Sequence, residues 1–280
     1  MKKIGFVDFY ISEWHANHYP AWIADICAEN GYDFELAYIF AEQDTSPVDG
    51  RSTAEWCREF GVRQCGTIDE LCEKSDVIFI LAPTNPEKHL AYARAVLPHK
   101  KPTYIDKTFA TSLDEAKEIF SIARNCGTPF FSSSALRYEE SLGDIENCRN
   151  MTVFISGASL EEYIIHDIER VVSKLGFGAC RILGIANGSQ RFFHLRYPDD
   201  RSACLVYADF GIPDANIMES ANCKKTILPR SDIFKRLLSD ILRFFEEKNV
   251  SFDTKQTLET MRIRDAVLAA DKRCGEWIDF

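Results

Sequence analysis

The chain has 280 residues, of which 46% are hydrophobic, so it can bury one large core or two ordinary ones without disulfides. A formal net charge of −10 and the lack of a basic run argue against a nucleic-acid surface and favour a small-molecule partner. No stretch approaches the roughly 20 apolar residues of a membrane span. Asp8 and Glu13 also interrupt the first apolar run before a secretory signal could form. We therefore expect a cytoplasmic protein that keeps its ten cysteines reduced.

The first half of the sequence alternates short apolar runs with amphipathic segments, which is the pattern of β–α–β units around a parallel sheet. We expect strands at 4–7, 34–40, 77–81, 102–105 and 129–131. We expect helices at 19–30, 52–61, from 67 onward, at 85–97 and at 112–124. Residues 1–132 are therefore predicted to form a Rossmann-like nucleotide-binding domain.

Local start and stop signals support these helices. Ser52 with Glu55 and Thr67 with Glu70 form capping-box patterns, and Gly61 is placed to end the helix between them.

The alternation of strands and helices ends after residues 132–134. Here we expect strands at 152–156, 181–187, 191–197 and 203–210, and helices at 161–175, 232–248 and 257–274. Because strand–helix alternation is lost, residues 133–280 are predicted to form an α+β domain for substrate binding and oligomerisation, with a mostly antiparallel open sheet. The whole chain is predicted to be an α/β protein.

The turn after the first strand lacks the usual signature of a dinucleotide site. In an open parallel sheet, ligands bind outside the carboxyl ends of the strands, and a G-x-G-x-x-G turn lets bare backbone approach the pyrophosphate. Asp8, Tyr10 and Glu13 stand at the three glycine positions. Two carboxylates and an aromatic ring would crowd and repel a pyrophosphate, unless the loop detours or the acids are paired. A plain loop-to-helix turn with solvated acids is at least an equal interpretation.

Two further strand ends carry candidate residues. Residues 82–89 combine a buried strand, two prolines and a helix start whose amides could face a cofactor, or the prolines only shape the turn. Asp106, Lys107 and Thr108 follow the next strand. A lysine there can hydrogen-bond a substrate hydroxyl or help to move a proton, although a salt-bridged lysine is the alternative.

In the second domain, Glu162 and His166 are four residues apart on a predicted helix and share a face. A carboxylate beside an imidazole suits general acid/base work, although Ser159 and Glu162 also fit a capping box. Arg137 and Tyr138 follow the domain junction and can line a cleft or pack on the surface. No metal site is expected, because His15 and His18 lack a third ligand.

Taken together, these elements resemble the Gfo/Idh/MocA family, the oxidoreductases of the glucose-fructose oxidoreductase and inositol dehydrogenase type. The resemblance covers nearly the whole chain. It is most specific in D-V-I-F-I-L-A-P-T-N-P-E-K-H at 76–89, K-K-P-T-Y-I-D-K-T-F-A at 100–110 and D-E-A-K at 114–117. It implies hydride transfer between NAD or NADP and a sugar, polyol or related hydroxyl compound, and a homodimer or higher homo-oligomer formed through the C-terminal sheet.

The resemblance also assigns roles. Lys107 stands at the lysine of the family's E-K-P motif, with Asp106 and Thr108 in place of its Glu and Pro, and His166 stands at the acid/base histidine. His166 is then the proton acceptor, Lys107 holds the reacting hydroxyl, and Glu162 orients the imidazole. The implied cofactor-binding residues are Asp8, Phe9, Tyr10, His15, Ala82, Pro83, Thr84, Asn85, His89, Asp106 and Lys107. The implied substrate-binding residues are Lys107, Arg137, Tyr138, Glu162 and His166.

Three hypotheses follow. The first is the NAD(P)-dependent oxidoreductase, which requires Lys107 and His166 to converge on one pocket. The second is a non-redox binding or regulatory protein that kept the fold and lost the dinucleotide. It is favoured by the missing glycines and by the lack of an acid clearly at the end of the second strand, where Glu42 is the nearest candidate. The third, metal-assisted chemistry at Glu162, His166 and His194, has the least support.

Overall fold

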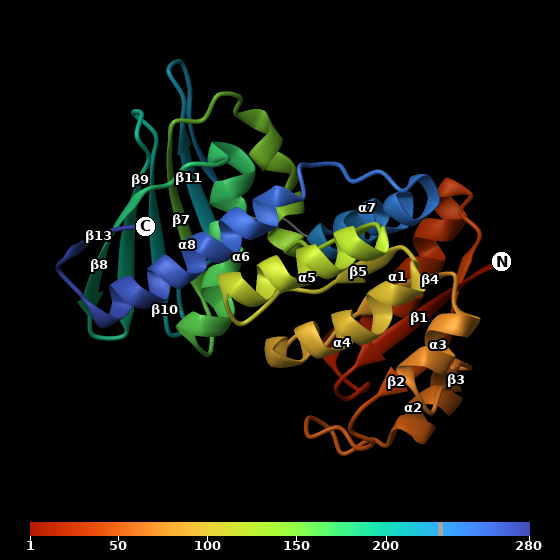
Figure 1. Ribbon diagram of the computed structural model, residues 1–280. Coiled ribbons are helices and arrows are strands. Elements are labelled where there is room, and N and C mark those ends of the chain that lie inside the picture. The colour runs from red at the N-terminus through yellow and green to blue at the C-terminus, as the bar shows by residue number, and fades with distance from the viewer. Residues whose placement is uncertain (229–231) are drawn as a thin grey trace. The chain divides into compact units, whose positions relative to one another are not determined.

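The computed structural model describes residues 1–228 and 232–280, which form two compact units (Figure 1). The first unit contains Met1–Ser133 and Lys235–Asp253, and the second contains Ser134–Phe234 and Thr254–Phe280. The predicted fold class, a Rossmann-like parallel-sheet domain and an α+β domain, is confirmed. The first boundary lies one residue beyond the predicted division at 132/133, and residues 235–253 belong to the first unit and not to the second.

Residues 235–253 belong to the first unit because the apolar face of helix α7 (Ile233–Glu247) packs there. Phe245 packs edge-on against Phe79 with ring centroids 5.2 Å apart, and Phe244 does the same against Phe131 at 5.1 Å. Burial of each large aromatic side chain is worth about 1.5–3 kcal/mol. The helix is therefore part of the hydrophobic core of the first unit.

The first unit contains a parallel sheet in the order β3-β2-β1-β4-β5-β6. Its strands are β1 (Lys2–Asp8), β2 (Phe34–Ala41), β3 (Arg63–Gln64), β4 (Val77–Ile80), β5 (Thr103–Ile105) and β6 (Phe130–Phe131). The strand order reverses between β1 and β4, which is the switch point at which such sheets bind ligands.

The helices of this unit are α1 (Trp14–Asn30), α2 (Thr53–Phe60), α3 (Ile68–Lys74), α4 (His89–Val96), α5 (Leu113–Cys126) and α7, with short 3₁₀ turns η1 (Pro86–Lys88) and η2 (Leu97–His99). The capping box of Ser52 and Glu55 is present, and Gly61 ends α2 in the left-handed conformation at φ 68°. Helix α1 begins at Trp14, earlier than the predicted Tyr19, because Glu13 caps it.

The second unit contains a mixed sheet in the order β12-β11-β7-β10-β9-β8-β13, in which only the β7–β10 pair is parallel. Its strands are β7 (Asn150–Ser156), β8 (Arg181–Asn187), β9 (Gln190–Arg196), β10 (Ser202–Ala208), β11 (Ala215–Glu219), β12 (Lys224–Ile227) and β13 (Trp277–Asp279). Helices α6 (Leu160–Leu175) and α8 (Lys255–Lys272) pack together over one face, and η3 (Ala135–Tyr138) and η4 (Glu140–Asp144) precede β7.

The other face of this sheet carries exposed apolar side chains. Ile185 is 50% exposed, Trp277 38% and Ile217 36%. Ile185 and Ile217 alternate along their strands with Gly184 and Met218, which face the helices, so they point to the opposite face. Trp277 pairs across the strands with Leu183, which lies on that same face. The sheet is therefore covered by helices on one face and open on the other.

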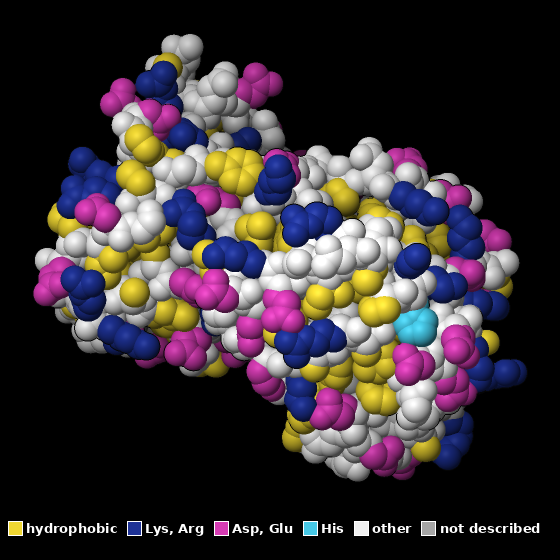
Figure 2. All heavy atoms as spheres, viewed as in Figure 1, with side chains coloured by type: hydrophobic (Ala, Val, Ile, Leu, Met, Phe, Trp, Pro, Cys, Tyr) yellow, Lys and Arg dark blue, Asp and Glu magenta, His cyan; other side chains and the backbone are white. Residues whose placement is uncertain are grey.

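Lys and Arg side chains intersperse with Asp and Glu on the face that Figure 2 shows, and neither sign gathers into one field there. Within 1–228 and 232–280, no helix combines the length and apolarity that a bilayer crossing requires.

Candidate functional site

Asp8 ends β1 and joins it to the end of β4. Its Oδ1 accepts hydrogen bonds from the amides of Phe9 at 2.7 Å and Ala82 at 3.1 Å, and the residue is 1% exposed. Its Oδ2 is buried and finds no hydrogen-bond partner in the described part of the chain. Burial raises the pKa of Asp8 well above its usual range, and the nearby charge of Glu13 raises it further.

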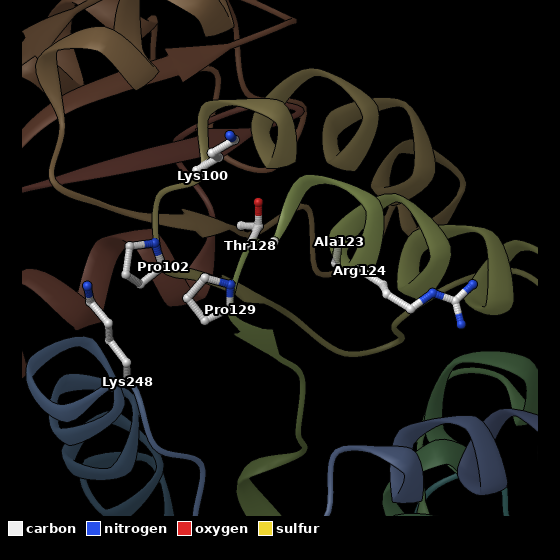
Figure 3. A pocket seen from close by; sticks show the side chains of 8 residues that line it. Lys100, Pro102, Ala123, Arg124, Thr128, Pro129 and Lys248 are labelled. Carbon is white, nitrogen blue, oxygen red and sulfur yellow. The ribbon is translucent and has the colours of Figure 1, made fainter.

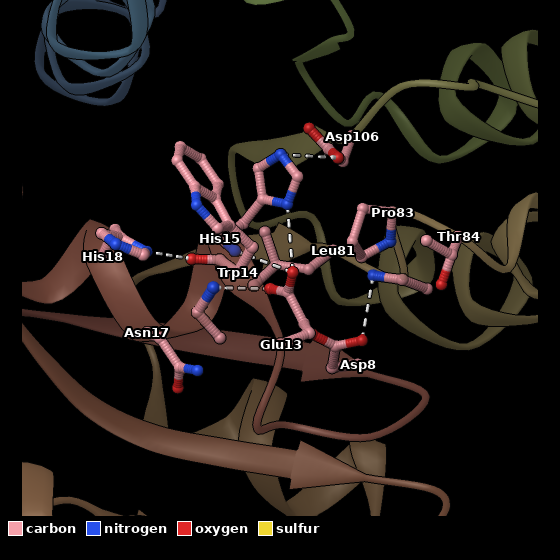
Figure 4. Close-up of polar contacts among 12 residues, drawn as sticks. Asp8, Glu13, Trp14, His15, Asn17, His18, Leu81, Pro83, Thr84 and Asp106 are labelled. Atoms are coloured by element: carbon pink, nitrogen blue, oxygen red, sulfur yellow. Dashed lines mark hydrogen bonds and ion pairs between the residues drawn. The ribbon is translucent and has the colours of Figure 1, made fainter. Parts of the chain in front are cut away.

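Glu13 occupies the N-terminus of α1. Its Oε1 accepts from the amide of Ala16 at 2.5 Å, and its Oε2 accepts from the amide of His15 at 2.7 Å (Figure 4). Oε2 also lies 3.0 Å from His15 Nδ1. Helix N-termini leave such amides without backbone partners and favour negative charge. The Glu13 carboxylate therefore takes the place in which a Rossmann turn binds phosphate.

His15 extends this contact to the end of β5, since its Nε2 lies 4.0 Å from Asp106 Oδ2. Asp106 is 1% exposed, and its Oδ1 accepts the Tyr104 hydroxyl at 3.0 Å. The hydroxyl of Tyr19 is buried nearby: burial raises its pKa well above the usual range, as do the charges of Asp106 and Glu13. The structure thus brings together the start of α1 and the end of β5, with the carboxylates of Glu13 and Asp106 on the two sides of the His15 imidazole.

The loop after β1 is tied down by its neighbours. The Tyr10 hydroxyl lies 3.2 Å from Thr84 Oγ1, and the ammonium group of Lys88 lies 4.7 Å from the centre of the Phe9 ring. Asn85 opens η1 and donates from its side chain to Glu87 at 2.9 Å. Residues 9–10 therefore contact residues 84–88, and these contacts fix the two loops against each other.

Glu42 follows β2, where a dinucleotide-binding domain has its ribose-binding acid. It accepts hydrogen bonds from Lys88 Nζ at 2.6 Å and from the Tyr92 hydroxyl at 2.8 Å. The hydrogen bond from Lys88 lowers the pKa of Glu42. Glu42 is therefore a carboxylate in an ion pair with Lys88.

Lys107 is half-buried, and its Nζ lies 3.4 Å from the carbonyl oxygen of Pro83. The Lys107–Thr108 peptide bond is cis, and Thr108 is buried. Lys107 and Pro83 thereby connect the loops that follow β5 and β4.

His89, the other histidine expected near a cofactor, is fully buried. Its Nε2 lies 2.7 Å from the Leu81 carbonyl oxygen, and its Nδ1 lies 3.1 Å from that of Phe109. Burial lowers the pKa of His89, so the ring is neutral and donates to one of these carbonyls. The contacts favour a positioning role, in which His89 fastens α4 to the loops after β4 and β5.

In the second unit, His166 lies on α6 with its Nδ1 2.7 Å from Ser134 Oγ. The same Oγ accepts from the amide of Leu136 at 3.2 Å, which fixes the position of the hydroxyl. Glu162 lies in the first turn of α6, where its amide donates to Ser159 Oγ at 3.3 Å. Ser134 therefore contacts the imidazole on its Nδ1 side, and the orienting role of Glu162 stays a prediction.

Arg137 lies in η3 and forms an ion pair with Glu169 at 2.7 Å, both side chains being less than a tenth exposed. It also donates to Gln256 at 2.7 Å. These contacts favour a structural role, because they fasten η3 to α6 and α8. Tyr138, at the end of η3, is half-buried.

Two other features are less favourable as sites. Within the described ranges, no three His, Cys, Asp or Glu side chains are grouped so that they could hold a metal ion. A hollow of about 520 Å³ lies before β5 and β6 and has Lys100, Arg124 and Lys248 on its rim (Figure 3). Figure 3 shows these three cations pointing in different directions, so they do not converge on one ligand.

Part of the sequence is similar to a known protein family. Residues 26–133 match the sequence profile of the Gfo/Idh/MocA family, described as an oxidoreductase family with an NAD-binding Rossmann fold. No curated protein matches the chain at a significant level.

Solved structures share the fold across both units at low identity. UDP-N-acetylglucosamine 3-dehydrogenase from Acidithiobacillus ferrooxidans is 14% identical with a TM-score of 0.77, and the match covers 97% of this chain and 98% of that one. A putative myo-inositol dehydrogenase from Sinorhizobium meliloti is 11% identical, with a TM-score of 0.76 and coverage of 100% and 99%. An Agrobacterium radiobacter oxidoreductase in complex with NAD+, L-tartaric acid and magnesium is 14% identical, with a TM-score of 0.78 and coverage of 99% and 98%.

Proposed function

We propose that the chain, whose residues 26–133 match the Gfo/Idh/MocA oxidoreductase family, oxidises or reduces a hydroxyl-bearing carbon of a sugar, polyol or related small molecule. The observation that supports this most directly is the setting of His166, whose ring Ser134 holds at 2.7 Å. Histidine is the side chain whose charge ordinarily changes between pH 5 and 8, so it suits the transfer of a hydroxyl proton.

We propose that His166 accepts the proton of the reacting hydroxyl. When Nδ1 carries the ring proton and donates it to Ser134 Oγ, the basic lone pair lies on Nε2. Lys107 is proposed to hold the reacting hydroxyl through its ammonium group, and Glu162 and Tyr138 are proposed to contact the rest of the substrate. Arg137 is proposed to position η3, because its guanidinium is paired with Glu169.

The hydride carrier that the family implies is a nicotinamide dinucleotide. Of NAD and NADP we propose NAD, because a carboxylate such as Glu42 at the end of β2 accepts a ribose hydroxyl and repels a 2′-phosphate. The turn after β1 does not fit a pyrophosphate as it stands, since Glu13 already accepts the hydrogen bonds of the amides at the start of α1.

Titration of the purified protein with NADH and NADPH, followed by nicotinamide fluorescence, tests this proposal. We expect NADH to bind more tightly than NADPH, and a panel of aldoses and polyols to yield a substrate whose oxidation produces NADH. His166→Asn should still bind NADH but lose turnover. Absence of binding by either dinucleotide at millimolar concentration would defeat the proposal.

A second candidate is a non-redox binding protein with a Rossmann fold. It is favoured by the carboxylates of Asp8, Glu13 and Asp106 at the edge of the sheet where a dinucleotide would bind. Dinucleotide that stays with the protein through purification, detected by mass spectrometry after denaturation, counts against this candidate.

A further inference from the structure

The carboxylate of Glu13 reproduces the contacts of a bound phosphate. At the start of a Rossmann helix, phosphate oxygens accept hydrogen bonds from backbone amides and are favoured by the helix dipole. Glu13 places one oxygen 2.5 Å from the amide of Ala16 and the other 2.7 Å from that of His15. A charge-assisted bond of this kind is about twice as strong as a neutral one.

The side chain is held in this position and is not a mobile surface group. Glu13 is 5% exposed, and the His15 ring contacts it at 3.0 Å while reaching toward Asp106 on its other side. The turn also contains the buried Asp8 Oδ2, which lacks a hydrogen-bond partner among the described residues. A phosphate would therefore have to displace one carboxylate and settle beside another.

We propose that the Glu13 carboxylate occupies the phosphate site at the N-terminus of α1 and thereby closes this site to pyrophosphate groups. The consequence of this closure for the dinucleotide rests on the proposed function. The phosphates of NAD can accept hydrogen bonds from these amides only if the Glu13 side chain moves away from them. The nearby carboxylates then disfavour the phosphates of the cofactor, which predicts weak binding of NAD by the wild-type protein.

Calorimetric titration with inorganic pyrophosphate at low ionic strength measures whether Glu13 closes the phosphate site, independently of NAD binding. Glu13→Ser keeps a hydroxyl that can cap the helix but removes the charge, and Glu13→Ala removes both. Glu29→Gln removes a charge from an exposed position in the last turn of the same helix and serves as the matched control. Thermal unfolding of each variant verifies that it is folded.

We expect Glu13→Ser to bind pyrophosphate at least about tenfold more tightly than the wild-type protein, with Glu29→Gln unchanged. Equal affinity in the wild-type protein and Glu13→Ser, or no binding in either, overturns the closure. Titration of the same proteins with NADH distinguishes the two proposals. If Glu13→Ser gains pyrophosphate but no protein binds NADH, the closure stands and the proposed cofactor fails.

Discussion

At the scale of single residues, Ser134 is the positioning residue of the proposed reaction. Ser134→Ala removes the hydroxyl that contacts Nδ1 of His166, and we expect kcat to fall about tenfold while KM stays unchanged. Ser134→Thr retains the hydroxyl and should restore most of kcat. Steady-state kinetics on the substrate that the sugar and polyol panel identifies measures both parameters.

The matched control is Ser159→Ala, which removes the cap of α6 without removing either partner of the hydrogen bond between His166 and Ser134. It should cost about 1 kcal/mol of stability and leave kcat unchanged. If Ser159→Ala lowers kcat as much as Ser134→Ala does, the effect is one of helix stability, and the positioning role is lost.

A second prediction at this scale concerns Asp167, whose carboxyl group accepts a hydrogen bond from Arg170, both side chains being fully buried. Burial raises the pKa of Asp167 to about 7, because desolvation outweighs the attraction of Arg170, and the charge of Asp214 acts in the same direction as burial. The folded state therefore holds a proton that the unfolded state releases near pH 4, so stability is lost as pH rises through about 4 to 7.

Asp167→Asn should remove this dependence. Between pH 5 and 7 we expect the wild-type protein to lose up to about 1.4 kcal/mol per pH unit relative to the variant. Urea unfolding at a series of pH values measures the difference. Asp200→Asn, at a side chain that is 94% exposed, should follow the wild-type curve. Parallel curves for Asp167→Asn and the wild-type protein would show that Asp167 does not titrate in this range.

At the scale of secondary-structure elements, β1 can pack closely against α3 because Gly5 has no side chain. A Cβ atom there would lie 2.5 Å from Ser75 Oγ and 2.6 Å from Leu71 Cδ2. Gly5→Ala should therefore destabilise the first unit by about 1–3 kcal/mol through overpacking. Gly66→Ala places its Cβ at an ordinary 3.6 Å from Glu70 and is the control for the same substitution. Equal unfolding midpoints for the two variants would contradict the close packing.

The elements that could be predicted are those whose signals are local. Ser52 with Glu55 and the left-handed Gly61 determine the ends of α2 within a few residues of chain. Strands β11, β12 and β13 were missed, because such short strands are defined by their partners in the sheet and carry little pattern of their own. The early start of α1 was missed because glutamate is not among the preferred N-cap residues.

At the scale of the whole molecule, topology explains which site residues could be predicted. The carboxyl ends of parallel strands meet at one edge, so Asp8 and Asp106 could be identified as neighbours before any contact was known. Other contacts of the candidate site could not be predicted, because they join residues far apart in the chain: His166 contacts Ser134, 32 positions away, and Lys88 contacts Glu42, 46 positions away. No pattern within a single element marks Ser134, which lies in a run of three serines at the predicted domain junction.

The open face of the sheet in the second unit supports the proposed homo-oligomer. Ile185, Ile217 and Trp277 expose apolar surface on the face opposite α6 and α8, and such surfaces mark interaction sites when they are contiguous. Ile217→Lys places a charge on this face near one edge of the sheet, and we expect light scattering to show a smaller particle than the wild-type protein forms. Val48→Lys makes a similar change at a side chain of the first unit that is 70% exposed, and should leave the mass unchanged. A wild-type protein that is already monomeric, or an Ile217→Lys variant with the wild-type mass, would show that copies of the chain do not associate through this face.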